Sequence, residues 1–377
     1  MGPLHGFKII EIAGIGPGQF CGMLLADMGA QLIRIDRPGE SDHDIGIPAK
    51  FNLMNRSRPV MRVDLKTAKG INLVLRLCEG ADALFEGLRP GAMERLGLGP
   101  QECMVRNGKL VYGRMTGWGQ TGPLADAVGH DGNYAALAGV IAAIGEKDGP
   151  PSIPLNLTAD FGGGGAYLAM GILAALLEAG RSGKGQVVDA AMVDGAASQM
   201  TLFYGLHAGG LWQDQRGSNI LDGAAPFYRA YRTNDDRYII VCAIERRFFK
   251  ALLELLGIDD TTLAEQYDQS KWPIQIEWFE SVFAGRTRDE WCALLEGTDA
   301  CFAPVLSLTE APQHEHNQTR STFVDIDGVT QPAPAPRFSR TVSEIGNTPG
   351  AVNADVVEVL LDWGLSDSEI DNLAVRV

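Results

Sequence analysis

The sequence has few positive charges and few cysteines for its length. Among its 377 residues, 32 Lys and Arg stand against 47 Asp and Glu, which gives a formal net charge of −15 at pH 7. Because nucleic-acid binding requires clustered cations, this balance argues against a nucleic-acid partner. The six cysteines show no CxxC spacing, which argues against a disulfide framework and against a zinc site. Buried, reduced thiols are expected instead.

The sequence shows none of the patterns expected of targeting or anchoring segments. The first residues do not show the charged stretch, apolar stretch and cleavage site of a signal peptide. No apolar run is expected to reach the length that spans a membrane. The last residues differ from the Ser-Lys-Leu type of peroxisomal signal. We therefore expect a cytoplasmic protein without a membrane partner.

The composition is that of a globular protein of enzyme size, with 45% hydrophobic and 21% charged residues. The length exceeds that of a usual single core, so two domains are expected. An irregular connector near residue 220 and a proline-rich stretch over 331–337 mark their limits. We predict an α/β fold in which 1–200 form a large domain completed by 331–377, 201–224 a linker, 225–320 a small α+β domain and 321–340 a return linker.

The first predicted βαβ unit, over 7–35, carries glycines in a pattern close to that of dinucleotide-binding proteins. Gly14 and Gly16 match the first two glycines of that fingerprint. Gln19 occupies the third position, where a small residue lets the helix and strand pack closely. The broken pattern favours a nucleotide-containing ligand bound in another manner over NAD.

Three arginines are predicted at the ends of strands, namely Arg37, Arg56 and Arg89. Open α/β sheets bind ligands at this edge. Arg37 follows Asp36, and this pair fits a phosphate better than a free ribose hydroxyl. A solvated surface position is the alternative interpretation of each arginine.

The stretch over 129–165 contains the best candidates for proton transfer. His130 is predicted in a loop, and Asp160 precedes four glycines over 162–165 and then a helix. An imidazole and a carboxylate that face one ligand can move a proton on and off carbon. The alternatives are a structural histidine and a helix-capping aspartate. The glycines are expected to expose N–H groups at the start of the helix, where these groups stabilise negative charge.

Other polar residues give weaker signals. Glu245 follows a predicted strand and precedes two arginines, so a surface ion pair is its simplest explanation. His314 and His316 form an HxH pattern without acidic or cysteine partners at ligand spacing, so no metal site is predicted.

Six motifs along the chain can be compared with known families, and they are GIGPG (14–18), RIDRPG (34–39), GQTGP (119–123), GHDGNY (129–134), PLNLTADFGGGG (154–165) and GKGQVVDAAMVDG (183–195). Together they resemble the family III CoA-transferase superfamily over essentially the full length, and the His in GHDGNY favours its racemase branch. This resemblance implies a Rossmann-like large domain, a smaller α+β domain and an interlocked homodimer.

The resemblance also implies roles for individual residues. His130 and Asp160 match the acid/base pair, and Glu245 matches a carboxylate that pairs with the histidine of the other subunit. Gly132 departs from the larger apolar residue usual in the family, which affects the acyl pocket. Positions matching CoA contacts are Arg37, Asn55, Arg56, Arg89, Asp131 and Tyr134.

The implied reaction interconverts (2R)- and (2S)-2-methylacyl-CoA through an enolate, with no metal and no cofactor beyond the CoA of the substrate. One alternative is a CoA-transferase in which Asp160 forms a covalent anhydride. Another is a CoA-binding protein without activity. Branched fatty acyl, sterol side-chain and arylpropionyl thioesters all fit the implied reaction.

Overall fold

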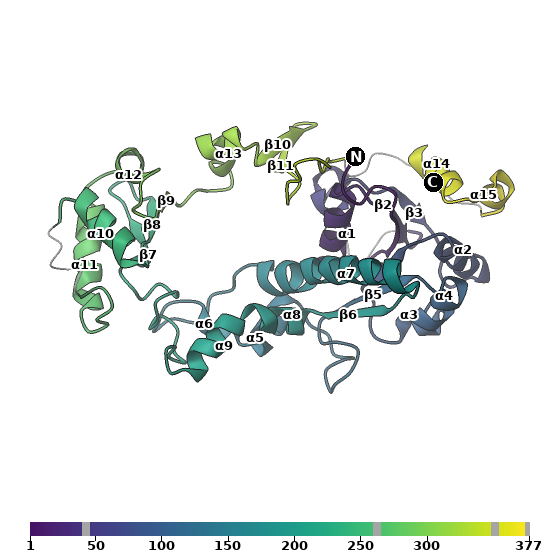
Figure 1. Cartoon of the computed structure of the whole chain (residues 1–377), viewed down its shortest axis with the longest axis horizontal. Coiled ribbons are helices and arrows are strands. Elements are labelled where there is room, and N and C mark those ends of the chain that lie inside the picture. The colour runs from purple at the N-terminus through teal and green to yellow at the C-terminus, as the bar shows by residue number, and fades with distance from the viewer. Residues whose placement is uncertain (40–45, 259–264, 348–353, 374–377) are drawn as a thin grey trace. The chain divides into compact units, whose positions relative to one another are not determined.

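A computed structural model describes residues 1–39, 46–258, 265–347 and 354–373. It divides the chain into two compact units, whose elements are labelled in Figure 1. The first unit comprises Met1–Ala138, Leu155–Met200 and Ser321–Val377, and the second comprises Gly139–Pro154 and Thr201–Arg320.

The first unit is built on a six-stranded sheet with the order β3-β2-β1-β4-β5-β6. All neighbouring strands are parallel, which confirms the predicted α/β class. The order reverses between β1 and β4, and sheets of this kind bind ligands beyond the carboxyl ends of the strands at such a point. The strands are β1 (Lys8–Ile12), β2 (Gln31–Asp36), β3 (Val60–Arg62), β4 (Ala83–Glu86), β5 (Val111–Thr116) and β6 (Val187–Ala191).

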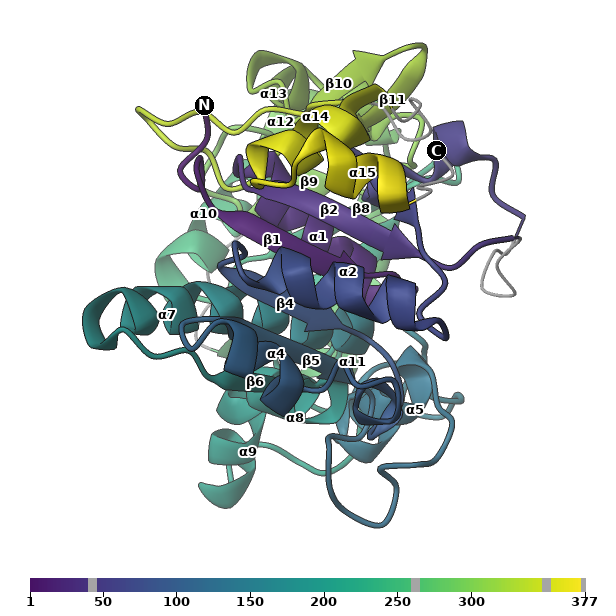
Figure 2. The same ribbon diagram turned by 90° about the vertical axis from the view of Figure 1, so that its right-hand side faces the viewer.

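Helices cover both faces of this sheet, which explains why the central strands are almost wholly buried. Figure 2 shows α2 and α4 in front of the strands and α1 behind them. One core cluster joins the sheet to the first group of helices, α2 (Ala68–Cys78), α4 (Pro100–Arg106) and α14 (Ala354–Asp362). The opposite face contacts α1 (Pro17–Asp27) and α7 (Tyr167–Ser182).

The end of the chain returns to the first unit. Leu360 and Trp363 lie in the core beside α2. Arg76 Nε of α2 lies 3.2 Å from Glu369 Oε1 of α15 (Asp367–Leu373). The return segment also contains an antiparallel hairpin, β10 (Phe323–Ile326) with β11 (Val329–Pro332), where a linker over 321–340 was predicted. Alternation around the Asp327-Gly328 turn was the missed signal for a hairpin.

The second unit contains an antiparallel sheet of β7 (Tyr228–Arg232), β8 (Tyr238–Cys242) and β9 (Phe302–Pro304). β7 and β8 pair as an antiparallel hairpin. Two boundaries differ from the prediction, because 139–154 belong to this unit and the predicted linker over 201–224 begins with helix α9 (Thr201–Ala208). Helices α10 (Arg246–Leu255), α11 (Trp272–Phe283) and α12 (Arg288–Leu295) complete an aromatic core with Phe227, Tyr231, Phe249, Phe279, Phe283 and Trp291.

A continuous helix over Leu157–Ser182 departs most from the sequence prediction. Its first ten residues, Leu157–Ala166, are wound as a π-helix, and α7 follows without a break. By length and composition alone this helix is apolar enough to cross a membrane, contrary to the prediction that no such run exists. It packs against β5, β6, α1 and α8 (Met192–Gln199), as a core helix does. A π-helix of this length is rare, and π-wound turns are frequent at functional sites.

Candidate active site

His130 lies directly before helix α5 (Asp131–Leu137), in extended backbone with φ −134° and ψ 175°. Its backbone N–H donates to Asn133 Oδ1 at 3.0 Å, which caps the start of the helix reciprocally. The imidazole itself is exposed. The local fold therefore fixes the backbone of His130 and leaves its ring on the surface.

Asp160 lies in the first turn of the π-helix and is half-buried. Burial raises the pKa of its carboxyl group, and Asn156 opposes this by donating to Asp160 Oδ2 at 3.2 Å. The negative charge of Asp131 raises the pKa further, and His130 lowers it. The charge of His130 therefore reaches the Asp160 carboxyl group, and the acid/base pairing of the two residues stays a prediction.

Asp131 connects the two candidate bases. Its Oδ1 accepts hydrogen bonds from the backbone N–H groups of Ala159 at 2.8 Å and of Asp160 at 2.7 Å. The side chain is buried. The sequence predicts Asp131 as a CoA contact; the structure corrects this, because its buried carboxylate caps the start of the π-helix.

Tyr134 also differs from its predicted role as a CoA contact. It is buried, donates to the carbonyl of Gly129, and lies edge-to-face with Trp118 at a ring distance of 4.7 Å. Its ring fills the space beside Gly117, where a Cβ would overlap it. Gly117 and Gly129 therefore admit the ring of Tyr134. Burial, with a contribution from Asp160, raises the pKa of Tyr134 to about 12.

The turn after β1 closes the other side of Asp160. A Cβ built on Gly16 would stand 3.3 Å from Asp160 Oδ2, and Gly16 has a φ of +61° that side chains rarely adopt. Arg34 fixes the turn by donating to the carbonyl of Gly14 at 3.1 Å. The same guanidinium pairs with buried Glu11. The turn that carries the incomplete dinucleotide fingerprint thus forms one side of the site around Asp160.

The glycines over 162–165 do not begin the helix, which corrects their predicted role as exposed N–H donors. They lie inside it, five to eight residues after Leu157. A Cβ on Gly163 would stand 2.6 Å from the N atom of Ala196 in α8, and one on Gly165 would stand 2.6 Å from the carbonyl of Pro17 in α1. These glycines therefore allow close packing between three helices.

Arg56 is a further correction. It is buried and forms a bidentate pair with Asp27, at 2.5 Å from its NH2 group to Oδ2. Its NH1 group donates to Gln331 Oε1 and to the carbonyl of Pro332, each at 2.9 Å. Arg56 therefore ties the returning chain to α1, and its guanidinium is not directed at a ligand.

The other CoA candidates divide between exposed and bonded positions. Arg37 follows β2 and Arg89 follows β4, and both side chains are exposed. Asn55 Oδ1 accepts from Arg58 at 3.3 Å. The sequence prediction missed Arg58, which is buried and pairs with Glu11 at 2.5 Å. The density of arginines in this stretch was the only signal for it.

Glu245 belongs to the second unit, whereas His130 and Asp160 belong to the first. It is exposed and lies directly before α10, where its carbonyl accepts from the N–H groups of Phe248 and Phe249. Its pairing with the histidine stays a prediction. Among the residues that the structure describes, no group of three or more His, Cys, Asp or Glu could hold a metal ion.

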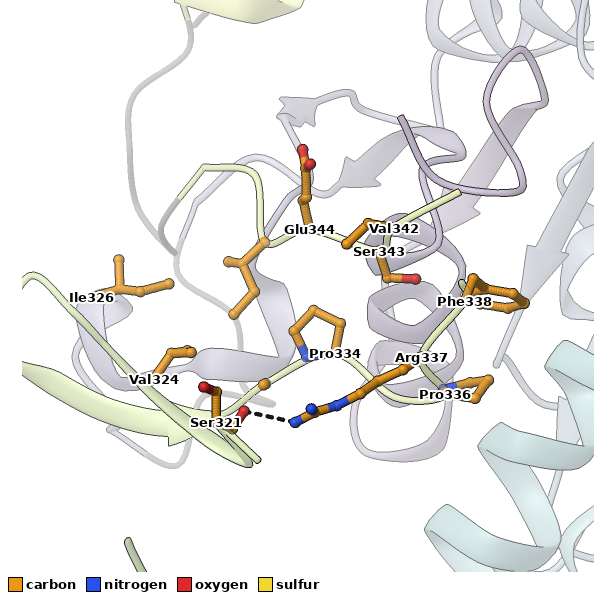
Figure 3. A pocket seen from close by; sticks show the side chains of 12 residues that line it. Ser321, Val324, Ile326, Pro334, Pro336, Arg337, Phe338, Val342, Ser343 and Glu344 are labelled. Atoms are coloured by element: carbon orange, nitrogen blue, oxygen red, sulfur yellow. Dashed lines mark hydrogen bonds between the residues drawn. The ribbon is translucent and has the colours of Figure 1, made fainter. Parts of the chain in front are cut away.

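A cavity of about 590 Å³ lies in the first unit, between the β10-β11 hairpin and the segment that follows it (Figure 3). Val324, Phe338 and Val342 line it, and Arg337 donates to the carbonyl of Ser321 at 2.9 Å beside it. None of the candidate site residues lines this cavity. It is therefore separate from the site around Asp160.

Comparison with known proteins agrees with the family resemblance of the sequence motifs. Alpha-methylacyl-CoA racemase of Mus musculus is 43% identical over 97% of this chain and 95% of its own length, and that of Homo sapiens is 40% identical over 98% and 96%. A crystal structure of a CAIB/BAIF family protein from Brucella suis has a TM-score of 0.81 at 25% identity and covers 96% of this chain and 99% of that one. CoA-transferase family III matches residues 4–355, so the chain belongs to this family.

Proposed function

We propose that this chain interconverts (2R)- and (2S)-2-methylacyl-CoA thioesters by removing the α-proton and returning it to the opposite face. The observation that carries the proposal is that His130 directly precedes Asp131, whose carboxylate accepts from the N–H of Asp160, so that the charge of His130 acts on Asp160. Two relatives that are 43% and 40% identical over nearly the whole chain bear the name of this activity. The enzyme is thus an isomerase.

The proposed reaction places the α-carbon between the two bases. One base removes the α-proton, and the C–H electron pair moves into the thioester carbonyl to form an enolate. The other base, which holds a proton, delivers it to the opposite face and inverts the centre. Burial helps Asp160 to hold a proton because it raises the pKa of the carboxyl group. The reaction requires no cofactor besides the CoA of the substrate.

CoA recognition is proposed for the exposed arginines at the sheet edge. Arg37 follows β2 and Arg89 follows β4, on either side of β1 in the sheet. A guanidinium is well suited to a phosphate because it donates in a planar fork. Two cations at this edge would bind an anionic ligand despite the net charge of −15.

A homodimer is proposed from exposed apolar residues of the long helix and from the position of Glu245. Met170, Ala174 and Leu177 are exposed at i, i+4 and i+7, and form one apolar stripe along α7. A second copy of the chain would cover this stripe, and its Glu245 would pair with His130. All six cysteines are free, which fits the proposed cytoplasmic location.

The activity can be tested with one stereoisomer of a 2-methylacyl-CoA in deuterated water. The proposal expects deuterium at the α-carbon and both stereoisomers in the product. His130→Ala and Asp160→Ala should each abolish inversion. A wild-type enzyme that gives neither deuterium nor the second stereoisomer would contradict the proposal.

A CoA-transferase is the second candidate, because the matching family is named for that activity, and a trapping experiment separates it from the racemase. In a transferase Asp160 would attack the thioester, release the CoA thiolate and form a mixed anhydride. Hydroxylamine would then trap Asp160 during turnover, and His130→Ala would retain transfer. Absence of trapping together with loss of inversion in His130→Ala favours the racemase.

A further inference from the structure

The carboxylate of Asp131 is placed between the two proposed bases of the active site. Its Oδ1 accepts from the N–H of Ala159 at 2.8 Å and from that of Asp160 at 2.7 Å. The second donor is the backbone N–H of Asp160, one of the two proposed bases. The other proposed base, His130, directly precedes Asp131 in the chain. Asp131 therefore links the backbones of both bases.

This arrangement restrains the separation of the two bases. The backbone of His130 is fixed at the start of α5, and that of Asp160 is fixed in the π-helix. Asp131 is only 5% exposed, so its side chain has little freedom to choose other partners. Because proton transfer depends steeply on the distance between reacting groups, a restraint of this kind affects the rate.

The second oxygen of Asp131 points to more than helix capping. Oδ2 is buried and has no hydrogen-bond partner among the residues that the structure describes. A buried oxygen that remains unpaired is costly, especially on an ionised group. A neutral Asn or Ser could also cap the helix, without burying a charge. A carboxylate is therefore costly here unless its charge has a use.

The charge of Asp131 acts on Asp160. Burial is the main reason that the pKa of Asp160 is raised, and the negative charge of Asp131 adds to it. The other titratable groups coupled to Asp160 are His130, which opposes this effect, and Tyr134, whose own pKa Asp160 helps to raise. A base that must also deliver a proton benefits from this arrangement, because it must carry that proton for part of the cycle.

We propose that Asp131 is a positioning residue of the racemase: its carboxylate holds Asp160 at a fixed distance from His130 and places a negative charge beside the Asp160 carboxyl group. This inference rests on the proposed function. In the direction that uses His130 as the base, the protonated carboxyl of Asp160 supplies the returning proton. Asp131 itself does not touch the reacting carbon.

Asp131→Asn separates the two parts of this role, because the amide keeps an acceptor oxygen and removes the charge. Two activity readouts are expected to change. The rate of α-proton exchange should fall on the order of tenfold, and the acid limb of its pH profile should move to lower pH. A purely structural role would not move that limb to lower pH. Asp131→Ser, a smaller neutral acceptor, provides a second variant if the first does not fold.

The titration of Asp160 can also be read without activity. Protein labelled with ¹³C at aspartate carboxyl groups gives a titration by NMR, in which Asp160→Asn identifies the Asp160 signal. Asp131→Asn should lower the titration midpoint of Asp160. The matched control is Asp64→Asn, at an exposed aspartate that accepts from the N–H of Lys66. The control should leave both the midpoint and the exchange rate as in the wild type.

The outcomes distinguish the two proposals. An unmoved Asp160 midpoint in Asp131→Asn, or an unchanged exchange rate in both Asp131 variants, would overturn the role of Asp131. Lack of inversion by the wild-type enzyme would instead overturn the proposed racemase, and the NMR titration would still report on Asp131.

Discussion

The carboxylate of Asp160 lies against Gly16, in the turn between β1 and α1. A Cβ built on Gly16 would stand 3.3 Å from Asp160 Oδ2. The turn and the π-helix are far apart in the sequence, and Gly164 and Gly165 bring them together by packing against Pro17. The glycine turn therefore limits where the proposed base can be placed.

Replacement of Gly16 by Ala should reduce both stability and rate. The φ of +61° strains an alanine by about 1–3 kcal/mol. The added methyl group would also displace the Asp160 carboxylate, and kcat for α-proton exchange should fall at least about tenfold. Gly97→Ala is the control, because its φ is +74° and no atom would meet its Cβ within 4 Å. Both variants are measured for kcat and for urea unfolding. Equal losses of kcat in Gly16→Ala and Gly97→Ala would contradict a role of Gly16 at the site.

Asn156→Ala should move the pH dependence in the direction opposite to that of Asp131→Asn. Asn156 donates to Asp160 Oδ2 at 3.2 Å and lowers the pKa of Asp160, against the larger effect of burial. Its removal should raise that pKa, so exchange that needs ionised Asp160 should be lost at a higher pH than in the wild type. The pH profile of kcat/KM measures this shift. A profile that stays in place, or moves to lower pH, would show that Asp160 does not control the acid limb.

The central strands of the first unit could be predicted because buried parallel strands form short apolar runs. β1 and β4 are examples, because every residue of the two strands is buried except the partly buried Lys8 at the start of β1. That His130 and Asp160 both lie beside Asp131 agrees with the family resemblance, while their roles as acid and base stay a prediction. These features depend on local pattern, which the sequence states directly.

The positions of buried charges could not be predicted, because they depend on partners that are distant in the sequence. Arg56 was expected at a ligand, yet it pairs with Asp27 and with Gln331, which is 275 positions away. Asp131 likewise bonds to the start of a helix whose first residue, Leu157, was not predicted. The run of glycines suggested a break in the chain, whereas close helix packing requires those glycines inside a helix.

The different positions of Arg56 and Arg37 lead to different mutant effects. Arg56→Ala would leave Asp27 buried without its partner, and loss of one member of a buried pair costs about 3–5 kcal/mol. Urea unfolding should show this loss. Arg37→Ala, at an exposed position, should change stability by less than about 0.5 kcal/mol.

For substrate binding the order of the two arginine variants should be reversed, with the larger effect in Arg37→Ala. Arg37→Ala should raise KM for the CoA thioester and leave kcat nearly unchanged, because the CoA moiety binds away from the α-carbon. Arg56→Ala should show normal KM in whatever fraction remains folded. If Arg56→Ala were as stable as the wild type and raised KM, its assignment to CoA contact would be correct after all.

Glu86 stands at the end of β4 and supports the loop that carries Arg89. Its Oε2 accepts from the N–H of Leu88 at 2.7 Å, and its Oε1 accepts from Arg114 Nε at 3.3 Å. Burial raises the pKa of Glu86 to about 7, although Leu88 and Arg114 lower it. The folded protein therefore holds a proton on Glu86 over a pH range in which the unfolded chain does not.

Stability should consequently decrease as the pH rises through this range. The contribution of Glu86 is complete below the unfolded pKa, near 4.3, and is lost as pH rises through about 7. The loss is on the order of 3 kcal/mol. Glu86→Gln should remove this pH dependence, because an amide cannot ionise, and urea unfolding at pH 5 and pH 8 measures the difference. Glu102→Gln, at an exposed position of α4, should retain the wild-type dependence. A Glu86→Gln protein that still loses stability between the two pH values by the wild-type amount would show that another group binds the proton.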